Sequence, residues 1–170
     1  MLQRIFLIFV LVLYLNSCSK KDIEYEPKDK NNAYKLYQEG FEAFEKGDYF
    51  YAEKKFTEAE LNFEIVDFAA KSAIMSSYSL YGINFYSDAL ANLERYLKKY
   101  PADNNVMYAH YLIAIIHYEQ ITDEKKDLNP LLDAKKKIDF FLKKYPNTDY
   151  AIDLKFKNDL IQNQLAAKEL

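Results

Sequence analysis

The chain has 170 residues, of which 50% are hydrophobic, 23 are Lys or Arg and 26 are Asp or Glu, giving a formal net charge of −3 at pH 7. This hydrophobic content argues against an intrinsically disordered chain, and the slightly acidic balance argues against a nucleic-acid-binding protein, which would carry a basic patch. The single cysteine excludes a disulfide within the chain, and three glycines are too few for a glycine-rich phosphate loop.

The first segment, residues 1–17, has the plan of a secretory signal peptide. Arg4 provides a positive start, and residues 5–15 form an apolar run of eleven residues without a charge. As a helix this run would span roughly 16 Å, whereas the hydrocarbon core of a bilayer is about 30 Å thick. The run is therefore too short for a transmembrane helix and predicts a signal peptide.

The signal ends in Leu15-Asn16-Ser17-Cys18, which resembles a bacterial lipobox, where cleavage occurs just before a cysteine whose sulfur takes a lipid. We expect Cys18 to carry a covalent lipid and the chain to hold no other cofactor; the alternative is a chance cysteine after an ordinary signal peptide. Under the sorting rule of enteric lipoproteins, Ser19 in place of Asp implies a lipid anchor at the periplasmic face of the cell outer membrane. Residues 18–31 are then the lipidated cysteine and a polar tether.

The remaining segment, 32–170, contains an internal repeat. LERYLKKYP at 93–101 and IDFFLKKYP at 138–146 lie 45 residues apart and share LKKYP. Self-similarity of this kind, with apolar residues at helical period, predicts an all-α tetratricopeptide-repeat (TPR) solenoid of helical hairpins, with about three repeats plus a C-terminal helix. Helices are expected near 32–46, 49–63, 67–82, 86–100, 104–121, 130–145 and 148–168.

Small and apolar residues at fixed positions support three copies of the hairpin. The small ones are expected where the two helices of a hairpin touch, because a large side chain there would push the helices apart. The residues expected at these contacts are Gly40, Ala52, Phe56 and Ala59 in the first copy, Ser77, Leu80, Ala89, Leu93 and Tyr96 in the second, and Ala114, Ala134, Ile138 and Phe141 in the third. An insertion at 122–129 accounts for the 45-residue spacing. Asn129 is expected to cap the following helix, with Pro130 at its first position.

The last predicted helix has an apolar stripe that is expected to cover the third hairpin. Its residues are Ile152, Phe156, Leu160 and Ile161. The helix is either the terminal cap that solenoids need or part of a longer array. We expect the second, because LAAKEL at 165–170 contains no helix-ending signal.

Together, the lipobox, the helical hairpins and the insertion resemble the BamD-type lipoproteins of the β-barrel assembly machinery. The most specific stretches are 100–120, with its Tyr-Ala approach to a helix, and 129–169, with an Asx-Pro cap after the insertion and the corner YPNTDYA at 145–151. The resemblance implies an adapter for the assembly and insertion of β-barrel proteins into the outer membrane. Its implied partners are a BamA-like barrel subunit, other lipoproteins of the machinery and nascent outer-membrane β-barrel proteins. The family has about five repeats, so contacts made by the last repeats are not expected here.

A peptide-binding groove is expected along the first helix of each hairpin, at fixed steps from its small residue. The residues in this register are Tyr34, Tyr37, Phe41, Phe44, Lys71, Ile74, Tyr78, Tyr81, Tyr108, Tyr111, Ile115 and Tyr118, most of them aromatic. Tyrosine combines an apolar ring with a polar tip, so such a face can be wet when empty and packed when filled. Lys71 is a candidate to meet a carboxylate. The alternative is that these aromatic residues belong to the core.

Candidate chemistry is otherwise sparse. His110 and His117 are seven residues apart, not at the i and i+4 spacing of a helical zinc motif, so no metal site is expected. No set of nucleophile and base predicts an enzyme. The alternative function is a periplasmic TPR scaffold lipoprotein that coordinates other envelope processes, such as cell division or peptidoglycan work.

Overall fold

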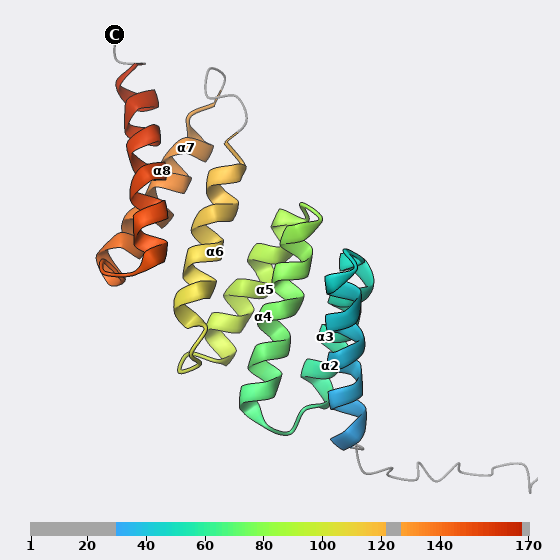
Figure 1. Cartoon of the computed structure of the whole chain (residues 1–170). Coiled ribbons are helices and arrows are strands. Elements are labelled where there is room, and N and C mark those ends of the chain that lie inside the picture. The colour runs from blue at the N-terminus through green and yellow to red at the C-terminus, as the bar shows by residue number, and fades with distance from the viewer. Residues whose placement is uncertain (1–29, 122–126, 168–170) are drawn as a thin grey trace, which may run out of the picture.

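The computed structural model describes residues 30–121 and 127–167, and the described chain is entirely helical (Figure 1). The elements are α2 (Lys30–Glu45), α3 (Tyr49–Asn62), α4 (Val66–Gly82), α5 (Tyr86–Lys99), α6 (Val106–Glu119), α7 (Asn129–Lys144) and α8 (Asp149–Ala166). Each predicted helix is present, with bounds within two residues of those expected. The predicted signal peptide, Cys18 and most of the tether and of the insertion lie outside the described residues.

The helices pair as antiparallel hairpins, α2 with α3, α4 with α5 and α6 with α7, and the hairpins stack side by side, followed by α8 (Figure 1). Each helix packs on the next along the chain, and α6 also contacts α8. This is the TPR-like solenoid that the repeat predicts. Within the described ranges, no helix combines the length and the apolar character that crossing a bilayer requires.

Local signals explain where the helices begin and end. The α2–α3 turn uses Gly47 in the left-handed region, at φ 77°, and the Asp48 side chain accepts a hydrogen bond from the Tyr51 amide at 3.2 Å. At the start of α8, Thr148 caps in the same way, accepting from the Ala151 amide at 3.2 Å. These polar groups satisfy amides that have no partner within the helix.

The prediction for the start of α7 is wrong by one residue. Leu128 occupies the cap position and Asn129 is already helical. The Asn129 amide is satisfied from outside the helix, by the Asp127 carboxylate at 2.9 Å. Asp127, two residues before the helix, therefore accepts the capping hydrogen bond at the start of α7, a role that the sequence pattern predicted for Asn129.

The hairpin contacts are the predicted ones. Of the residues expected there, those in the second helices are fully buried: Ala52, Phe56, Ala59, Ala89, Leu93, Tyr96, Ala134, Ile138 and Phe141. Gly40 faces Phe56, because a Cβ added at Gly40 would lie 3.0 Å from Phe56 Cδ1, a tight contact that the ring would have to relieve by shifting. The close approach in the first hairpin thus depends on a glycine against a ring, with Ala43 and Ala52 beside it.

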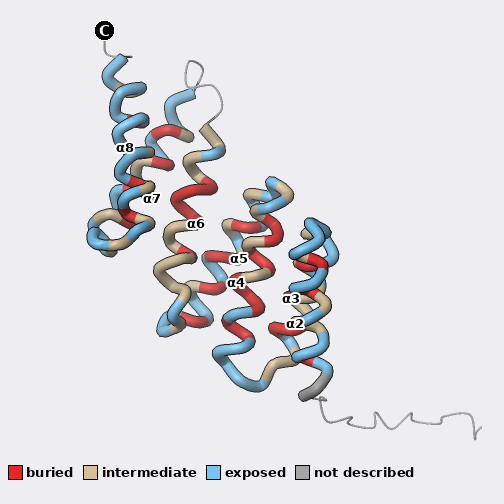
Figure 2. The backbone as a smooth tube through the Cα atoms, viewed as in Figure 1, coloured by how far each residue is buried: buried red, intermediate tan, exposed pale blue. Residues whose placement is uncertain are grey.

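The cores of the repeats are built around α4 and α6, which carry much of the buried surface (Figure 2). Helix α4 is rich in small residues, and Ser72, Ser77 and Ser79 each donate a hydrogen bond to the backbone carbonyl four residues earlier, at 2.8, 3.0 and 2.9 Å. These bonds satisfy buried hydroxyls within the helix itself. Helices α3 and α5 can therefore pack closely on both sides of α4.

The predicted stripe on α8 is wrong apart from Ile161. Ile152 and Phe156 are 68% and 64% exposed, and Leu160 is also exposed. The buried side of α8 instead contains Ala151, Leu154 and Ile161, which pack with residues of α6 and α7. The helix has apolar residues on two faces, and the smaller one meets the neighbours.

Candidate functional site

A continuous row of aromatic rings crosses the first helices of successive hairpins. Phe44 of α2 lies 5.4 Å from Tyr78 of α4, ring centre to ring centre, and Tyr78 lies 6.2 Å from Tyr108 of α6. Tyr108 lies 6.2 Å from Tyr111, which lies 4.4 Å from Tyr150 of α8. We call these five residues the aromatic row. All five are only partly buried, so their rings contribute to the surface as well as to packing.

The aromatic row borders a cavity of about 370 Å³ between α2, α4 and α6. The residues that line it are Phe44, Lys71, Ile74, Met75, Tyr78, Asn105 and Tyr108. The walls are mainly apolar and aromatic, with a cation at one edge and an amide at another. A cavity of this size and lining suits side chains of a bound peptide.

Lys71 is exposed at the edge of this cavity. Its ammonium lies 5.5 Å from the ring centre of Tyr37, within cation–π range. Within the described part of the chain it forms no ion pair. Its charge is therefore available to a carboxylate on a ligand.

The hydroxyl groups of Tyr108 and Tyr111 in the row remain protonated at physiological pH. Burial raises the pKa of Tyr108 far above its usual value, with a smaller contribution from the neighbouring tyrosines. Burial and the 3.0 Å hydrogen bond that Tyr111 donates to Asp153 raise the pKa of Tyr111 to about 12. Tyr108 and Tyr111 therefore contribute neutral hydroxyl groups to the row.

Other predicted groove residues surround the row. Tyr81 stacks on Tyr78 at 5.8 Å and donates a 2.8 Å hydrogen bond to Glu119 of α6. Tyr118 is half-buried, with the Lys157 ammonium 5.4 Å from its ring centre. These contacts connect α4 to α6 and α6 to α8.

Seven of the twelve predicted groove residues do not line the cavity: Tyr34, Tyr37, Phe41, Tyr81, Tyr111, Ile115 and Tyr118. Ile74 does reach its floor but is 5% exposed and belongs to the core, as does Ile115. Tyr34 packs away from the row, 5.1 Å from both Phe63 and Phe68. Phe41 is 42% exposed and is not among the residues that line the cavity. The helical register places residues on a face but does not tell how far along the helix the neighbouring hairpin reaches.

The sequence interpretation missed Tyr150, Met75 and Asn105. Tyr150 had a visible signal, because Tyr150-Ala151 repeats Tyr108-Ala109 and both alanines are fully buried. Met75 and Asn105 had none, since one is an ordinary apolar helix residue and the other precedes α6 in a connection.

His110 and His117 lie on one face of α6, as predicted. Burial lowers the pKa of both, and for His110 the charges of Lys144 and Lys137 lower it further. Both are therefore neutral at pH 7. Within residues 30–121 and 127–167, no group of three or more His, Cys, Asp or Glu side chains is arranged to hold a metal ion.

Comparison with known proteins places the chain in a family. The model of the YfiO family, described as "Outer membrane lipoprotein", matches residues 29–170. Relatives named "Outer membrane protein assembly factor BamD" are 33% identical over 135 residues in Caulobacter vibrioides and 30% identical over 167 residues in Rickettsia prowazekii. These matches cover 79% and 96% of this chain but 44% and 64% of those relatives, so the chain spans roughly half the length of one and under two thirds of the other.

A more distant relative of the same name, from Xylella fastidiosa, is 23% identical over 172 residues, covering 95% of this chain and 58% of that protein. The family match covers the tetratricopeptide-like hairpins and the aromatic row that crosses them. The chain therefore belongs to the YfiO family of outer membrane lipoproteins.

Proposed function

We propose that this protein is an adapter in outer-membrane protein assembly and that its aromatic row binds apolar segments of partner proteins. The observation that carries this proposal is the row itself, five partly exposed rings running without a break from α2 to α8 beside a 370 Å³ cavity. The names of the relatives favour outer-membrane protein assembly over the alternative of a scaffold for other envelope processes.

The proposed partners follow from this role. They are a BamA-like barrel subunit, other lipoproteins of the assembly machinery, and nascent β-barrel proteins that present an aromatic segment. The adapter works by binding and positioning and not as an enzyme. Tyrosine suits the work because the ring provides apolar contact while the hydroxyl remains hydrated when the groove is empty.

The aromatic row is tested with the double variant Tyr78→Ala/Tyr108→Ala and a labelled twelve-residue peptide ending in Phe. We expect affinity to fall at least about tenfold, because two rings lining the cavity are removed. Binding is measured by fluorescence anisotropy, with helix content and melting temperature recorded for each variant.

The matched control is Tyr51→Ala, which removes an exposed tyrosine of α3 outside the row and should leave affinity unchanged. A folded double variant that binds the peptide as well as the parent protein would contradict a binding role for the row.

The membrane anchor is a second part of the proposal. Cys18 is expected to carry the lipid, which would hold the hairpins at the periplasmic face of the outer membrane; more than one acyl chain is needed for stable anchoring. Metabolic labelling with palmitate should mark the protein, and Cys18→Ser should abolish the label and release the protein from the membrane fraction. Label that persists in the Cys18→Ser protein would exclude this site.

A further inference from the structure

The second helices of the first two hairpins are joined by an ionic contact. Glu60 of α3 is 4% exposed and accepts two hydrogen bonds from Arg95 of α5, at 2.7 and 2.8 Å. Lys99 and Tyr100 each donate a further bond to the same carboxylate, both at 2.9 Å. The carboxylate thus fills the space between α3 and α5 and fixes one helix on the other.

The next junction, between α5 and α7, replaces this carboxylate with an apolar residue. Fully buried positions align α3 with α5: Ala52 corresponds to Ala89 and Phe56 to Leu93. In that alignment Glu60 corresponds to Leu97. The group that seals the first junction is therefore missing from the second.

The cations of the first junction are only partly retained in the second. The shared LKKYP segments align Arg95 with Phe140 and Lys99 with Lys144. Lys144 keeps its charge, but its ammonium lies over the Phe140 ring at 5.6 Å and 3.3 Å from His110 Nε2. A lysine that has a carboxylate partner in one repeat has a neutral histidine in the next.

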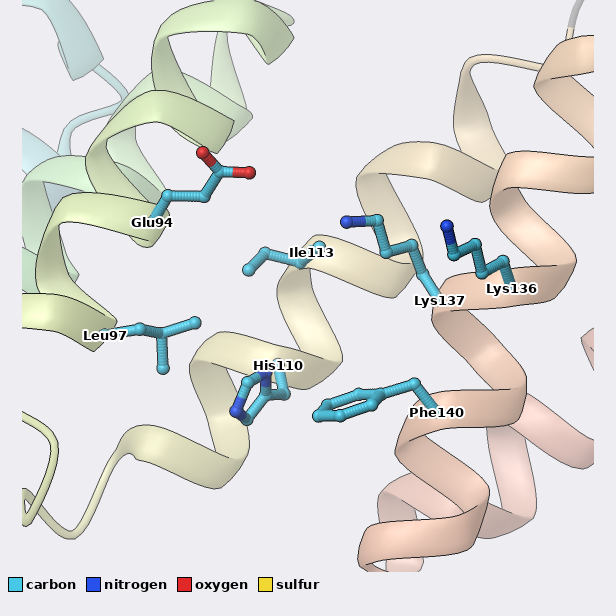
Figure 3. Close-up of a pocket in the computed structure, with 7 residues that line it drawn as sticks. All are labelled: Glu94, Leu97, His110, Ile113, Lys136, Lys137 and Phe140. Atoms are coloured by element: carbon cyan, nitrogen blue, oxygen red, sulfur yellow. The ribbon is translucent and has the colours of Figure 1, made fainter.

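A groove of about 310 Å³ is open at this second junction (Figure 3). Leu97 of α5 lies on one wall and Phe140 of α7 on the other, with His110 and Ile113 of α6 between them. Lys136 and Lys137 project from α7 at its rim, and Glu94 from α5 on the opposite side. The groove combines an apolar floor with a strongly cationic rim on one wall.

Lys136 and Lys137 at this rim, and Lys144 beside the groove residue His110, have no acidic partner in the described part of the chain. No carboxylate there lies within ion-pair distance of Lys136, Lys137 or Lys144, whereas the neighbouring Lys135 pairs with Asp139 at 2.7 Å. His110, neutral at pH 7, adds a hydrogen-bonding group without a charge. The local excess of positive charge favours an anionic ligand.

We propose that this α5/α7 groove is a docking site for a segment of a partner protein that presents a carboxylate beside an apolar side chain. The apolar side chain rests on Leu97 and Phe140, and the carboxylate meets Lys137 and Lys144, taking the place that Glu60 has in the first junction. The internal comparison between the two junctions defines the chemistry of the missing group, a carboxylate on a side chain. A protein segment supplies both parts at fixed spacing.

This site is separate from the aromatic row. On α6 the row uses Tyr108 and Tyr111, whereas the groove uses His110 and Ile113. Residues two apart on a helix point about 200° apart, so the two sites lie on opposite sides of α6. The inference therefore does not rest on the proposed function of the row, and the two can fail separately.

The test uses a fluorescein-labelled helical peptide of fifteen residues with one Glu between a Leu and a Phe on the same face, and a matched peptide with Gln for Glu. The full-length protein in detergent should bind the Glu peptide at least about tenfold more tightly than the Gln peptide. Lys137→Gln/Lys144→Gln should remove that preference. The control Lys98→Gln/Lys143→Gln makes the same change of charge at exposed positions outside the groove and should retain the preference.

A second variant rebuilds the first junction inside the groove. Leu97→Glu/Phe140→Arg should place an ion pair in the groove, at the positions that correspond to Glu60 and Arg95 of the first junction. This pair should close the groove and weaken binding of the Glu peptide at least about tenfold. The variant Tyr78→Ala/Tyr108→Ala should leave this binding unchanged.

Equal affinity for the two peptides would overturn the proposal. So would unchanged binding in the two groove variants that remain folded. Binding of phosphatidylglycerol vesicles through Lys137 and Lys144, without binding of the peptide, would instead assign the rim to a membrane surface.

Discussion

At the scale of single residues, Glu60 is a buried carboxylate whose charge must be compensated by its neighbours. Burial of its carboxylate would by itself raise the pKa, but the hydrogen bonds from Arg95, Lys99 and Tyr100 outweigh burial and lower the pKa to about 2. The folded state therefore binds the proton more weakly than the unfolded chain does. Stability from this contact is present above the unfolded pKa near 4.5 and is lost as pH falls through about 2.

Glu60→Gln should lower the free energy of unfolding at pH 7 by about 2 kcal/mol, because buried donors lose their charged acceptor. Arg95 and Lys99 are more than a third exposed, so solvent screening keeps this value below what the pKa shift alone implies. Urea unfolding at pH 7, 5 and 3 should show the difference from the parent shrinking toward low pH. The exposed control Glu42→Gln should show no such difference, and a Glu60→Gln effect that is independent of pH would contradict the assignment.

At the scale of elements, α8 shows what the helical period can and cannot indicate. Its residues Ile152 and Phe156 and its residues Leu154 and Ile161 make two apolar faces. Only contact with α6 and α7 selects between them, and the selected face is narrow because Ala151 allows close approach. Helix α8 is anchored by few side chains, each fully buried.

We therefore expect opposite results from two substitutions on α8. Leu154→Ala should lower the free energy of unfolding by about 3 kcal/mol, since it leaves a cavity among fully buried neighbours. Phe156→Ala, at a 64% exposed position, should change it by less than about 0.5 kcal/mol. Denaturant unfolding of the two proteins under identical conditions makes the comparison. A larger loss for Phe156→Ala would show that the broader stripe is the packed one.

At the scale of the whole molecule, helices α4 and α6 divide two kinds of surface. One side of α6 contributes Tyr108 and Tyr111 to the aromatic row, and the other contributes His110 and Ile113 to the α5/α7 groove. Repetition makes this possible, because each hairpin presents equivalent positions that can be filled differently. Glu60 and Leu97 occupy equivalent positions of successive hairpins. Glu60 closes the first junction with an ion pair, whereas the groove at Leu97 remains open.

The sequence predicted the helices and hairpin contacts well because both depend on local pattern. Ala89, Leu93 and Tyr96 follow from spacing alone, and all three are fully buried. Contacts between hairpins were not predictable in the same way. Glu60 and Arg95 are 35 residues apart and look like solvated helix charges until the superhelix brings them together. The candidate site lies between these cases, since its tyrosines were found by register while Asn105 required the three-dimensional path of the chain.

The spacing of the rings in the aromatic row also has an optical consequence. The chain contains 16 tyrosines and no tryptophan, so its ultraviolet emission comes from tyrosine. Rings with centres 4.4 to 6.2 Å apart exchange excitation energy readily, so the excitation that absorption creates at one ring can pass to the others along the row. A tryptophan on any segment that settles against these rings becomes the acceptor of that energy. Binding of a tryptophan-containing segment can therefore be followed without a label, as tryptophan emission on excitation of the tyrosines.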